Sequence, residues 1–351
     1  SINGGALDAK TAVGVGLMML LDPFSEFTSG SFRDIDIVIP PGTMASALPP
    51  EGAIMLYWEV GSVIMGSMLG ALADALGEKA IGGDTGSNNV HNAFGTGPDG
   101  TPWACSSLAG GETGPWGADR NADGDSHTCP YLLNIMSPSV ESLEADFPLM
   151  MLRKEYVPDT AGAGFNRGGA GILKDVMWTA PAEHQTIPMR FKYPSGVGVV
   201  GGGDGRNGGV WIFGPDGRAT SGREVFVATD DDGVYAGATP VAGMMEPGAN
   251  TLDPDGEYVY YSDPPTRQTA PGATWRYLTN GGGGWGDPFA RDPERVKNDV
   301  RDGYVSLDAA AERFGVVISG DPENDPERLE VDSEATSQRR QAAARNQRRA
   351  K

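Results

Sequence analysis

The chain has few of the residues that build disulfide frameworks and nucleic-acid surfaces. Only two cysteines occur among 351 residues, Cys105 and Cys129. No disulfide framework is indicated, and reduced intracellular thiols are the simpler interpretation, so we expect a cytoplasmic protein. The 27 basic residues are outnumbered by 47 acidic ones, for a formal net charge of −20. Because binding a phosphate backbone requires a basic face, we expect no nucleic-acid partner.

Several common catalytic and nucleotide-binding motifs are also missing. There is no G-x-S-x-G elbow and no H-E-x-x-H helix, so standard serine-hydrolase and zincin mechanisms have no support. The stretch GGALDAKT (4–11) has Ala9 where a phosphate loop needs its second glycine. GVGVVG (196–201) has dinucleotide-loop spacing but is followed by more glycines instead of a helix. We therefore expect no nucleotide site on this chain.

Two apolar stretches resemble membrane signals, and we interpret both as core helices. Residues 11–21 follow Lys10 but lack a small-residue cleavage pattern. Residues 52–77 contain Glu59 and are interrupted by glycines at 61, 66, 70 and 77, and a spanning helix rarely tolerates an unpaired carboxylate. We expect the small residues of this helix to let another backbone come close, and we expect no membrane partner.

The rest of the chain predicts an α+β fold: a β-rich body with buried glycine-rich helices and a small helical C-terminal segment. Strand-like runs separated by glycine-rich turns are 33–43, 172–179, 187–193, 210–213 and 224–228. A helix is predicted at 306–315, with Ser306 as its N-cap and Gly315 at its end.

These patterns divide the chain into three parts. They are an α/β part with core helices (1–150), a β-rich part (151–290) and a helical C-terminal segment (291–351) that ends in a basic tail. The tail, 339–351, is interpreted as solvated, with a docking arm for an acidic partner as the alternative.

The loop DRNADGDSHTCP (119–130) gathers most of the polar candidates. It resembles the front of a calcium loop, but Pro130 stands where a bidentate glutamate is needed, so tight calcium binding is not expected. Asp125, His127 and Cys129 alternate and would face one side of an extended strand. A zinc site would require the fold to bring in the distant histidines 91 and 184. The alternative is a polar loop with an ordinary histidine.

A second stretch, GGGGWGDPFARDPERVKNDVRDGYVSLDAAAERFGVVI (281–318), places a glycine run before a capped helix. The glycines permit close approaches that side chains would block. Asp292 is a predicted N-cap with Pro293 at the first helical position. We expect a loop wall followed by a fixed helical brace.

This stretch closely resembles the C-terminal signature of the hydantoinase B and 5-oxoprolinase family, which includes ATP-dependent ketone carboxylase subunits. The resemblance covers most of residues 1–318. It continues through SGSFRDIDIVIPPGT (29–43), GSNNVHNAFG (86–95), LAGGETGPWGADRNADGDSHTCPYLLN (108–134) and DTAGAGFNRGGAGI (159–172).

The resemblance implies a subunit of a heteromeric ATP-dependent enzyme that hydrolyses a cyclic amide. The alternatives are a subunit of an acetone- or acetophenone-type ketone carboxylase and a non-catalytic structural subunit of either. ATP with Mg would lie on a hydantoinase A-type partner subunit. Another chain would supply the family's N-terminal half, whose metal motifs precede the equivalent of Ser1. A divalent metal would lie on another chain, with none on this chain alone.

The small-molecule site is expected to draw on the polar residues around the acidic loop. Glu112, His127 and Asp125 are the candidate catalytic residues, and Glu112 or His127 could move a proton. Arg120 and Asn134 are the candidate substrate-binding residues. The guanidinium of Arg120 suits a phosphate, a carboxylate or bicarbonate.

Overall fold

The computed structural model describes most of the chain. The described residues are 3–21, 23–24, 26, 28–50, 52, 57–87, 90–97, 99–105, 113–133, 135–187, 193–215, 238–244, 258–259 and 266–350. The helices are α1 (Ala6–Leu21), α2 (Tyr57–Leu76), α3 (Val140–Asp146), α4 (Pro293–Arg301), α5 (Leu307–Arg313) and α6 (Ser333–Ala350). Short 3₁₀ turns are η1 (Ser29–Phe32), η2 (Gly77–Lys79), η4 (Pro288–Ala290) and η5 (Pro326–Arg328).

The described strands form two larger antiparallel sheets and one small hairpin. The four-stranded sheet has the order β2 (Pro102–Cys105), β1 (Val90–Thr96), β5 (Ala182–Ile187) and β9 (Thr266–Thr269). The six-stranded sheet has the order β3 (Leu149–Tyr156), β4 (Ile172–Trp178), β10 (Thr274–Leu278), β6 (Gly209–Phe213), β7 (Thr239–Met244) and β8 (Tyr258–Val259). The hairpin joins β11 (Ile318–Ser319) to β12 (Glu330–Val331).

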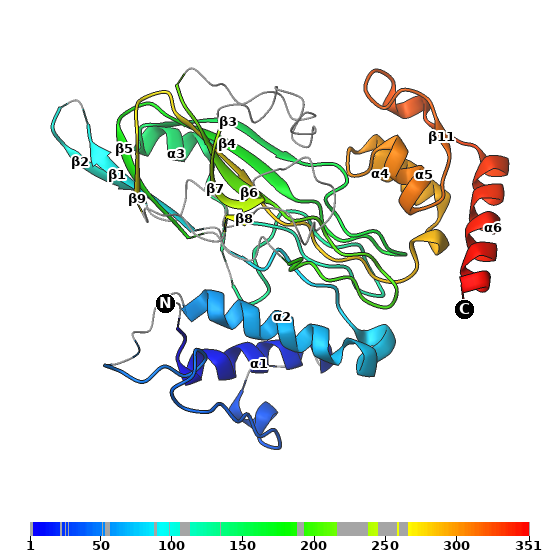
Figure 1. Ribbon diagram of the computed structural model, residues 1–351, viewed down its shortest axis with the longest axis horizontal. Helices are drawn as coiled ribbons and strands as arrows, with labels where there is room; N and C mark the ends of the chain where they lie inside the picture. Colours follow the sequence, from blue (N-terminus) through cyan, green and yellow to red (C-terminus); the bar gives the residue numbers. More distant parts are fainter. Residues whose placement is uncertain are drawn as a thin grey trace.

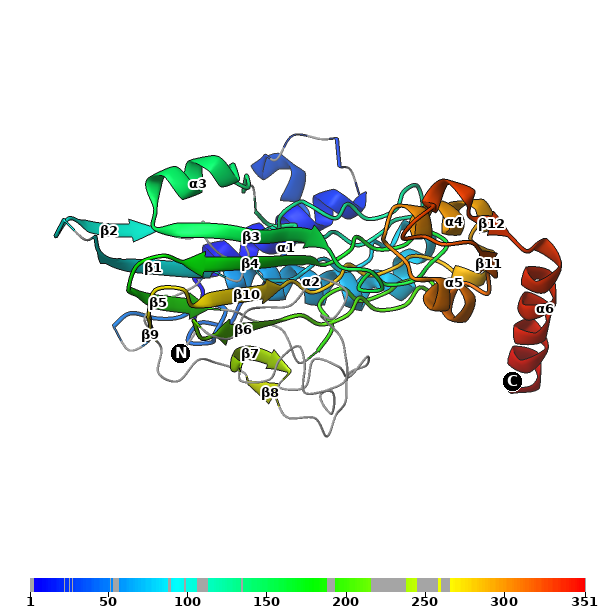
Figure 2. The same cartoon turned by 90° about the horizontal axis from the view of Figure 1, so that it is seen from above.

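The main core lies where these two sheets pack together. Trp178 and Trp275 of the larger sheet contact Ala93 and Ala182 of the smaller one. Figures 1 and 2 show α1 and α2 side by side along one side of the sheets, with α4, α5 and α6 gathered at one end. The predicted α+β fold is confirmed. Strands from both sides of position 150 share the four-stranded sheet, and the three-part division of the chain stays a prediction.

The central strands follow from their composition. All five residues of β10 are buried, which suits a strand between two neighbours. Its Arg276 is fully buried and donates two hydrogen bonds of 2.8 Å to Asp175 of β4, so both charges keep a partner away from water. The predicted strands at 172–179 and 210–213 are therefore confirmed as β4 and β6.

The other three strand predictions are not confirmed by the described residues. Residues 33–43 carry no strand, because the segment is mostly exposed, pairs with no described strand and runs into two prolines that lack amide hydrogens. The prediction at 187–193 meets the end of β5 at Ile187, and its residues 188–192 lie outside the described part. The prediction at 224–228 lies wholly outside it.

The glycine run at 281–284, predicted as a loop wall, forms the centre of a bundle of extended segments. Its backbone amides and carbonyls exchange hydrogen bonds of 2.8 to 3.0 Å with segments 82–83, 116–118, 160–169 and 196–206. The sequence GVGVVG (196–201) lies in this bundle, which explains its glycines without a nucleotide. Backbone groups here are satisfied by other backbone groups although no regular sheet is formed.

The backbone segments of this bundle lie too close together for any side chain on Gly281 or Gly284. A Cβ atom on Gly281 would lie 1.8 Å from the carbonyl oxygen of Thr160, and one on Gly284 would lie 2.2 Å from that of Ala163. Real Cβ contacts essentially never fall below 3.0 Å. The prediction that this run permits close backbone approach is confirmed.

The N-terminal helices pack through side chains, whereas the sequence suggested close approach of a second backbone. α1 and α2 share a cluster built on Ala12, Leu20, Met65 and Leu69. Two of the helix glycines face side chains, since a Cβ on Gly16 would meet Met68 and one on Gly61 would meet Leu132. The expectation of a second backbone against α2 is therefore wrong at Gly61, where a bulky side chain fills the space.

The segment Glu59–Lys79 is long and apolar enough to cross a membrane by length and composition, and 28% of its most apolar stretch is buried. Such a helix is weak evidence for a span, because core helices of globular proteins pass the same test. Its Glu59 is fully buried and accepts a hydrogen bond of 3.4 Å from the Ser87 hydroxyl. The carboxylate therefore faces protein.

The C-terminal helices begin where the sequence predicted. Asp292 caps α4 by accepting from the Glu294 amide, with Pro293 in the first turn. Ser306 caps α5, and Gly315 follows the helix with φ of 65°. The basic tail is helical, as part of α6, and projects from this end of the molecule in Figure 2.

Candidate functional site

Arg291 and Arg295 hold the acidic loop 119–130 against the start of α4. Asp123 accepts hydrogen bonds of 2.7 and 2.8 Å from Arg291, whose side chain is 1% exposed. Arg295 adds a third contact at 3.0 Å, and Asp299 binds Arg291 from its other side at 2.7 Å. The two motifs that carry the family resemblance therefore contact each other directly, and the carboxylate of Asp123 is committed to arginines.

This environment shifts the pKa of Asp123. Burial raises it, but the hydrogen bonds and charge of Arg291, with the charges of Arg167 and Arg295, outweigh burial and bring the pKa below its ordinary value. The loop is also tied down through its backbone, where the Trp116 amide donates to Asp125 O at 2.8 Å. His127 is thus presented from a fixed loop.

The structure describes three of the five predicted site residues. Arg120, Asp125 and His127 are exposed, and Glu112 and Asn134 lie outside the described residues. Cys129 does not share their side, because it is buried with its thiol donating to Leu133 O at 2.8 Å. Pro130 follows Cys129, and the loop turns into a bend at Tyr131 instead of continuing as a strand.

His127 lines a cavity of about 350 Å³ at the edge of the six-stranded sheet. Its other lining residues are Lys154, Glu155 and Tyr156 of β3 and Ile172 at the start of β4. This is where the glycine bundle meets the first strands, since the Val157 amide donates to Gly171 O at 2.9 Å. A basic side chain, a phenol and an imidazole therefore converge on one space.

The electrostatics of this cavity favour a neutral imidazole. Burial lowers the pKa of His127 below 6.5, and the positive charges of Lys154 and Lys174 lower it further. Burial also lowers the pKa of Lys154. The pKa of Tyr156 is raised by burial, then by Tyr304 and Asp125. At neutral pH the imidazole can accept a proton or donate a hydrogen bond.

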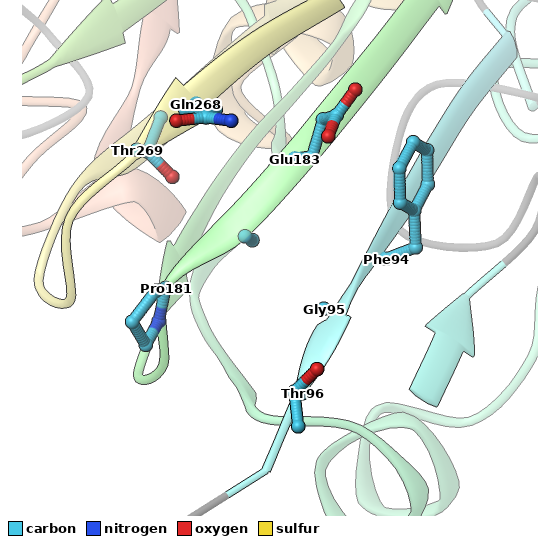
Figure 3. A pocket seen from close by; sticks show the side chains of 8 residues that line it. Phe94, Gly95, Thr96, Pro181, Glu183, Gln268 and Thr269 are labelled. Carbon is cyan, nitrogen blue, oxygen red and sulfur yellow. The ribbon is translucent and has the colours of Figure 1, made fainter. Parts of the chain in front are cut away.

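A second cavity, of about 450 Å³, lies on the four-stranded sheet (Figure 3). Phe94 of β1, Glu183 of β5 and Gln268 of β9 line it from three adjacent strands, with Pro181 at its end. Glu183 is the one ionisable side chain among its eight lining residues. This space offers fewer chemical groups than the cavity at His127.

The other two histidines form a buried pair between the sheets. His91 Nε2 lies 2.9 Å from His184 Nδ1, the other ring nitrogen of His91 bonds the Tyr277 hydroxyl, and His184 Nε2 lies 2.7 Å from Thr269 Oγ1. Burial, then the neighbouring imidazole, holds the pKa of His91 well below its ordinary value. Burial lowers that of His184 to about 3. The fold brings these two histidines together and leaves His127 apart from them.

Among the described residues, no group of three His, Cys, Asp or Glu side chains could hold a metal ion. The two sequences with nucleotide-loop spacing are engaged in other contacts. The Gly5 amide at the start of α1 donates to Asp8 at 2.9 Å, and 196–201 is packed into the glycine bundle. No step through ATP is therefore assigned to this chain's side chains.

Residues 1–288 match the family described as hydantoinase B/oxoprolinase. The chain belongs to the hydantoinase B/oxoprolinase family. Caprolactamase subunit beta of Pseudomonas jessenii is 27% identical over 334 residues, which are 92% of this chain and 50% of that protein. This member of the hydantoinase B/oxoprolinase family thus spans about half the length of that relative.

Two solved structures share the fold. A crystal structure of ATP-dependent caprolactamase from P. jessenii superposes with a TM-score of 0.75 at 22% identity, covering 96% of this chain and 52% of that one. Nucleotide-free acetone carboxylase gives a TM-score of 0.72 at 19% identity, covering all of this chain and 46% of that one. At these identities the likeness concerns the fold.

Sequence reasoning missed Lys154 and Tyr156, which complete the cavity at His127. The run LMMLRKEY (149–156) shows β-strand composition, and its polar end could have been recognised as a strand terminus. Its approach to His127 is a long-range contact that no local pattern indicates.

Proposed function

We propose that this chain is a subunit of a heteromeric ATP-dependent enzyme of the hydantoinase/oxoprolinase type, which hydrolyses a cyclic amide. The family match over residues 1–288 carries the proposal. The similarity to a caprolactamase subunit beta supports it, since a caprolactam is a cyclic amide. The chain spans half of that relative, so further polypeptide would complete the site.

Within this proposal the cavity at His127 is part of the small-molecule site. The lowered pKa of its imidazole leaves it able to accept a proton from an attacking water at neutral pH. Asp125 is exposed beside it on the same loop, and Arg120 is free to reach an anionic group from the loop's other end. Glu112 and Asn134 remain proposed members of the site.

The proposed partners supply the nucleotide, the metal and the rest of the family's fold. A hydantoinase A-type subunit would bind ATP with Mg, another chain would supply the family's N-terminal half, and a divalent metal would lie outside this chain. Leu7, Leu21, Phe24 and Val38 are more than 60% exposed near α1, which supports a covered surface in the working complex. We place the complex in the cytoplasm.

Ketone carboxylation is the second candidate, because acetone carboxylase shares the fold over the whole of this chain. A non-catalytic structural subunit is the third. It is favoured by the exposure of Arg120 and Asp125, which make few contacts that would fix their side chains for catalysis.

The test is a reconstitution with the neighbouring subunits and ATP. Incubation with caprolactam, hydantoins or oxoproline should give ring-opened product, and His127→Gln should lower kcat about 100-fold if it moves the proton. Labelled bicarbonate with candidate ketones forms the second arm, and carboxylated product without ring opening would overturn the proposal. An unchanged kcat in His127→Gln would support the structural subunit.

A further inference from the structure

We infer that the cavity at His127 is a binding site for a small oxyanion, a carboxylate or a phosphate, held chiefly by Lys154. Its use as part of the enzyme's substrate site rests on the proposed function. Anion binding itself does not, because it follows from the arrangement of charges around the cavity.

Lys154, which lines this cavity, lies opposite a second lysine on the neighbouring strand. Lys154 of β3 and Lys174 of β4 are cross-strand partners, and opposed residues on antiparallel strands project from the same face. Lys174 is 5% exposed. The positive charges of Lys154 and Lys174 both act on the imidazole of His127, so this side of the sheet presents positive charge to the cavity.

Lys154 has no carboxylate partner among the described residues. Its ammonium donates to the neutral Ser137 hydroxyl at 2.8 Å, and it makes no ion pair within 4 Å there. A partly buried ammonium without a counter-charge is costly, and an ammonium carries three donors. The ammonium of Lys154 can therefore donate a hydrogen bond to a ligand oxygen without breaking an existing ion pair.

The nearby carboxylates do not cancel this charge. Glu155 lines the cavity but is ion-paired with Arg153, which also lies 3.5 Å from Asp175. Asp125 is exposed to water and acts on the phenol of Tyr156. The cavity therefore holds a lysine ammonium that has no ion pair among the described residues, on a chain whose net charge is −20.

Size and donors fit a small anion. A volume of about 350 Å³ lies at the lower end of the range for small-molecule pockets. The Tyr156 hydroxyl and the neutral imidazole of His127 can each donate one hydrogen bond to a ligand oxygen. Together with Lys154 they form three donors of different geometry around one space.

The test uses the full chain and two probes, acetate and inorganic phosphate, at constant ionic strength, with chloride as the reference salt. Binding is followed by the imidazole ¹H–¹³C resonance of His127 and by calorimetry. We expect saturable binding of at least one probe with a shifted His127 signal. The stronger probe identifies the carboxylate or the phosphate arm. Equal shifts with chloride, or no saturation, would overturn the inference.

Variants separate site binding from general charge effects. Lys154→Met should weaken binding about tenfold or more, because it removes a charge-assisted contact. Lys10→Met, the same change at an exposed residue of α1, should leave binding unchanged. Lys154→Arg should retain binding within a few-fold and serves if the methionine variant fails to fold. Equal binding by Lys154→Met and the wild type refutes the assignment.

Discussion

Replacing Gly282 with alanine tests whether the glycine bundle is held by backbone contact. The new Cβ would lie 2.0 Å from the carbonyl oxygen of Trp116 and 2.6 Å from its carbonyl carbon. Relief to the 3.0 Å limit requires the two segments to separate by about 1 Å, and no rotamer change helps because both contacts are backbone. Segment 281–284 has neighbours on several sides, so moving away from one brings it against another.

Two hydrogen bonds of Gly282 to its other neighbours resist that movement. The Gly162 amide donates to Gly282 O at 2.8 Å, and the Gly282 amide donates to Gly169 O at 3.0 Å. Losing both at about 1 kcal/mol each, with about 1–3 kcal/mol of overpacking strain, lowers the free energy of unfolding by about 3–5 kcal/mol.

The assay is urea denaturation followed by circular dichroism, with Gly70→Ala as the matched control. A Cβ on Gly70 would meet nothing within 4 Å, and alanine in a helix is better than glycine by about 0.5–1 kcal/mol. The control should therefore be neutral or stabilising. If Gly282→Ala unfolds within 1 kcal/mol of the wild type, the bundle is looser than its distances imply and the reasoning is refuted.

Three further predictions concern the loop, the histidines and the N-terminal helices. Asp123→Asn should lower the free energy of unfolding by about 2–3 kcal/mol, because Arg291 loses a bidentate partner, while Asp302→Asn at an exposed pair should have no measurable effect. The pKa of Asp123 is lower folded than unfolded, so its stabilisation is present above about pH 4 and is lost as pH falls through the folded value. The free energy of unfolding of Asp123→Asn should therefore depend less on pH in this acid range. An unchanged pH dependence would contradict the pairing of Asp123 with Arg291. The imidazole of His127 should titrate by NMR with a midpoint below 6.5 that rises in Lys154→Met, whereas burial should keep the imidazoles of His91 and His184 neutral at that pH. A second titrating imidazole would show that the pair His91–His184 is open to water. Gly66→Leu should weaken association with partner chains by a few kcal/mol if α2 docks a partner, whereas an equal loss of melting temperature in the isolated chain would indicate packing within the chain.

Local signals in the sequence predicted the ends of elements well. Asp292 and Ser306 cap helices in the structure because capping depends on a side chain and an amide two or three residues away. The buried runs of β4 and β6 were equally visible, since a central strand needs apolar residues on both faces. The segment 33–43 misled because alternation alone cannot supply a neighbouring strand.

The candidate site was predicted only in part. His127 was recognised from its loop, but its cavity depends on β3, which approaches it through the fold. Cys129 shared the alternation and yet points inward, because the chain bends after it instead of continuing extended. The pairing of His91 with His184 joins residues 93 positions apart, a relation set by the register of β1 and β5. Sequence patterns indicate residue chemistry, and long-range register decides which residues meet.

The acidity of the chain and the positive cavity together define what the site can admit. At physiological ionic strength the field of surface charges is screened within about 8 Å, so the net charge of −20 repels a large polyanion that must approach along the surface. A small anion in the cavity would contact Lys154, which lines the cavity and has no ion pair among the described residues, and partial burial strengthens the attraction there. Lowering the ionic strength should slow the entry of a small carboxylate or phosphate while strengthening its binding, because the net negative charge of the chain and the attraction of Lys154 are then both less screened.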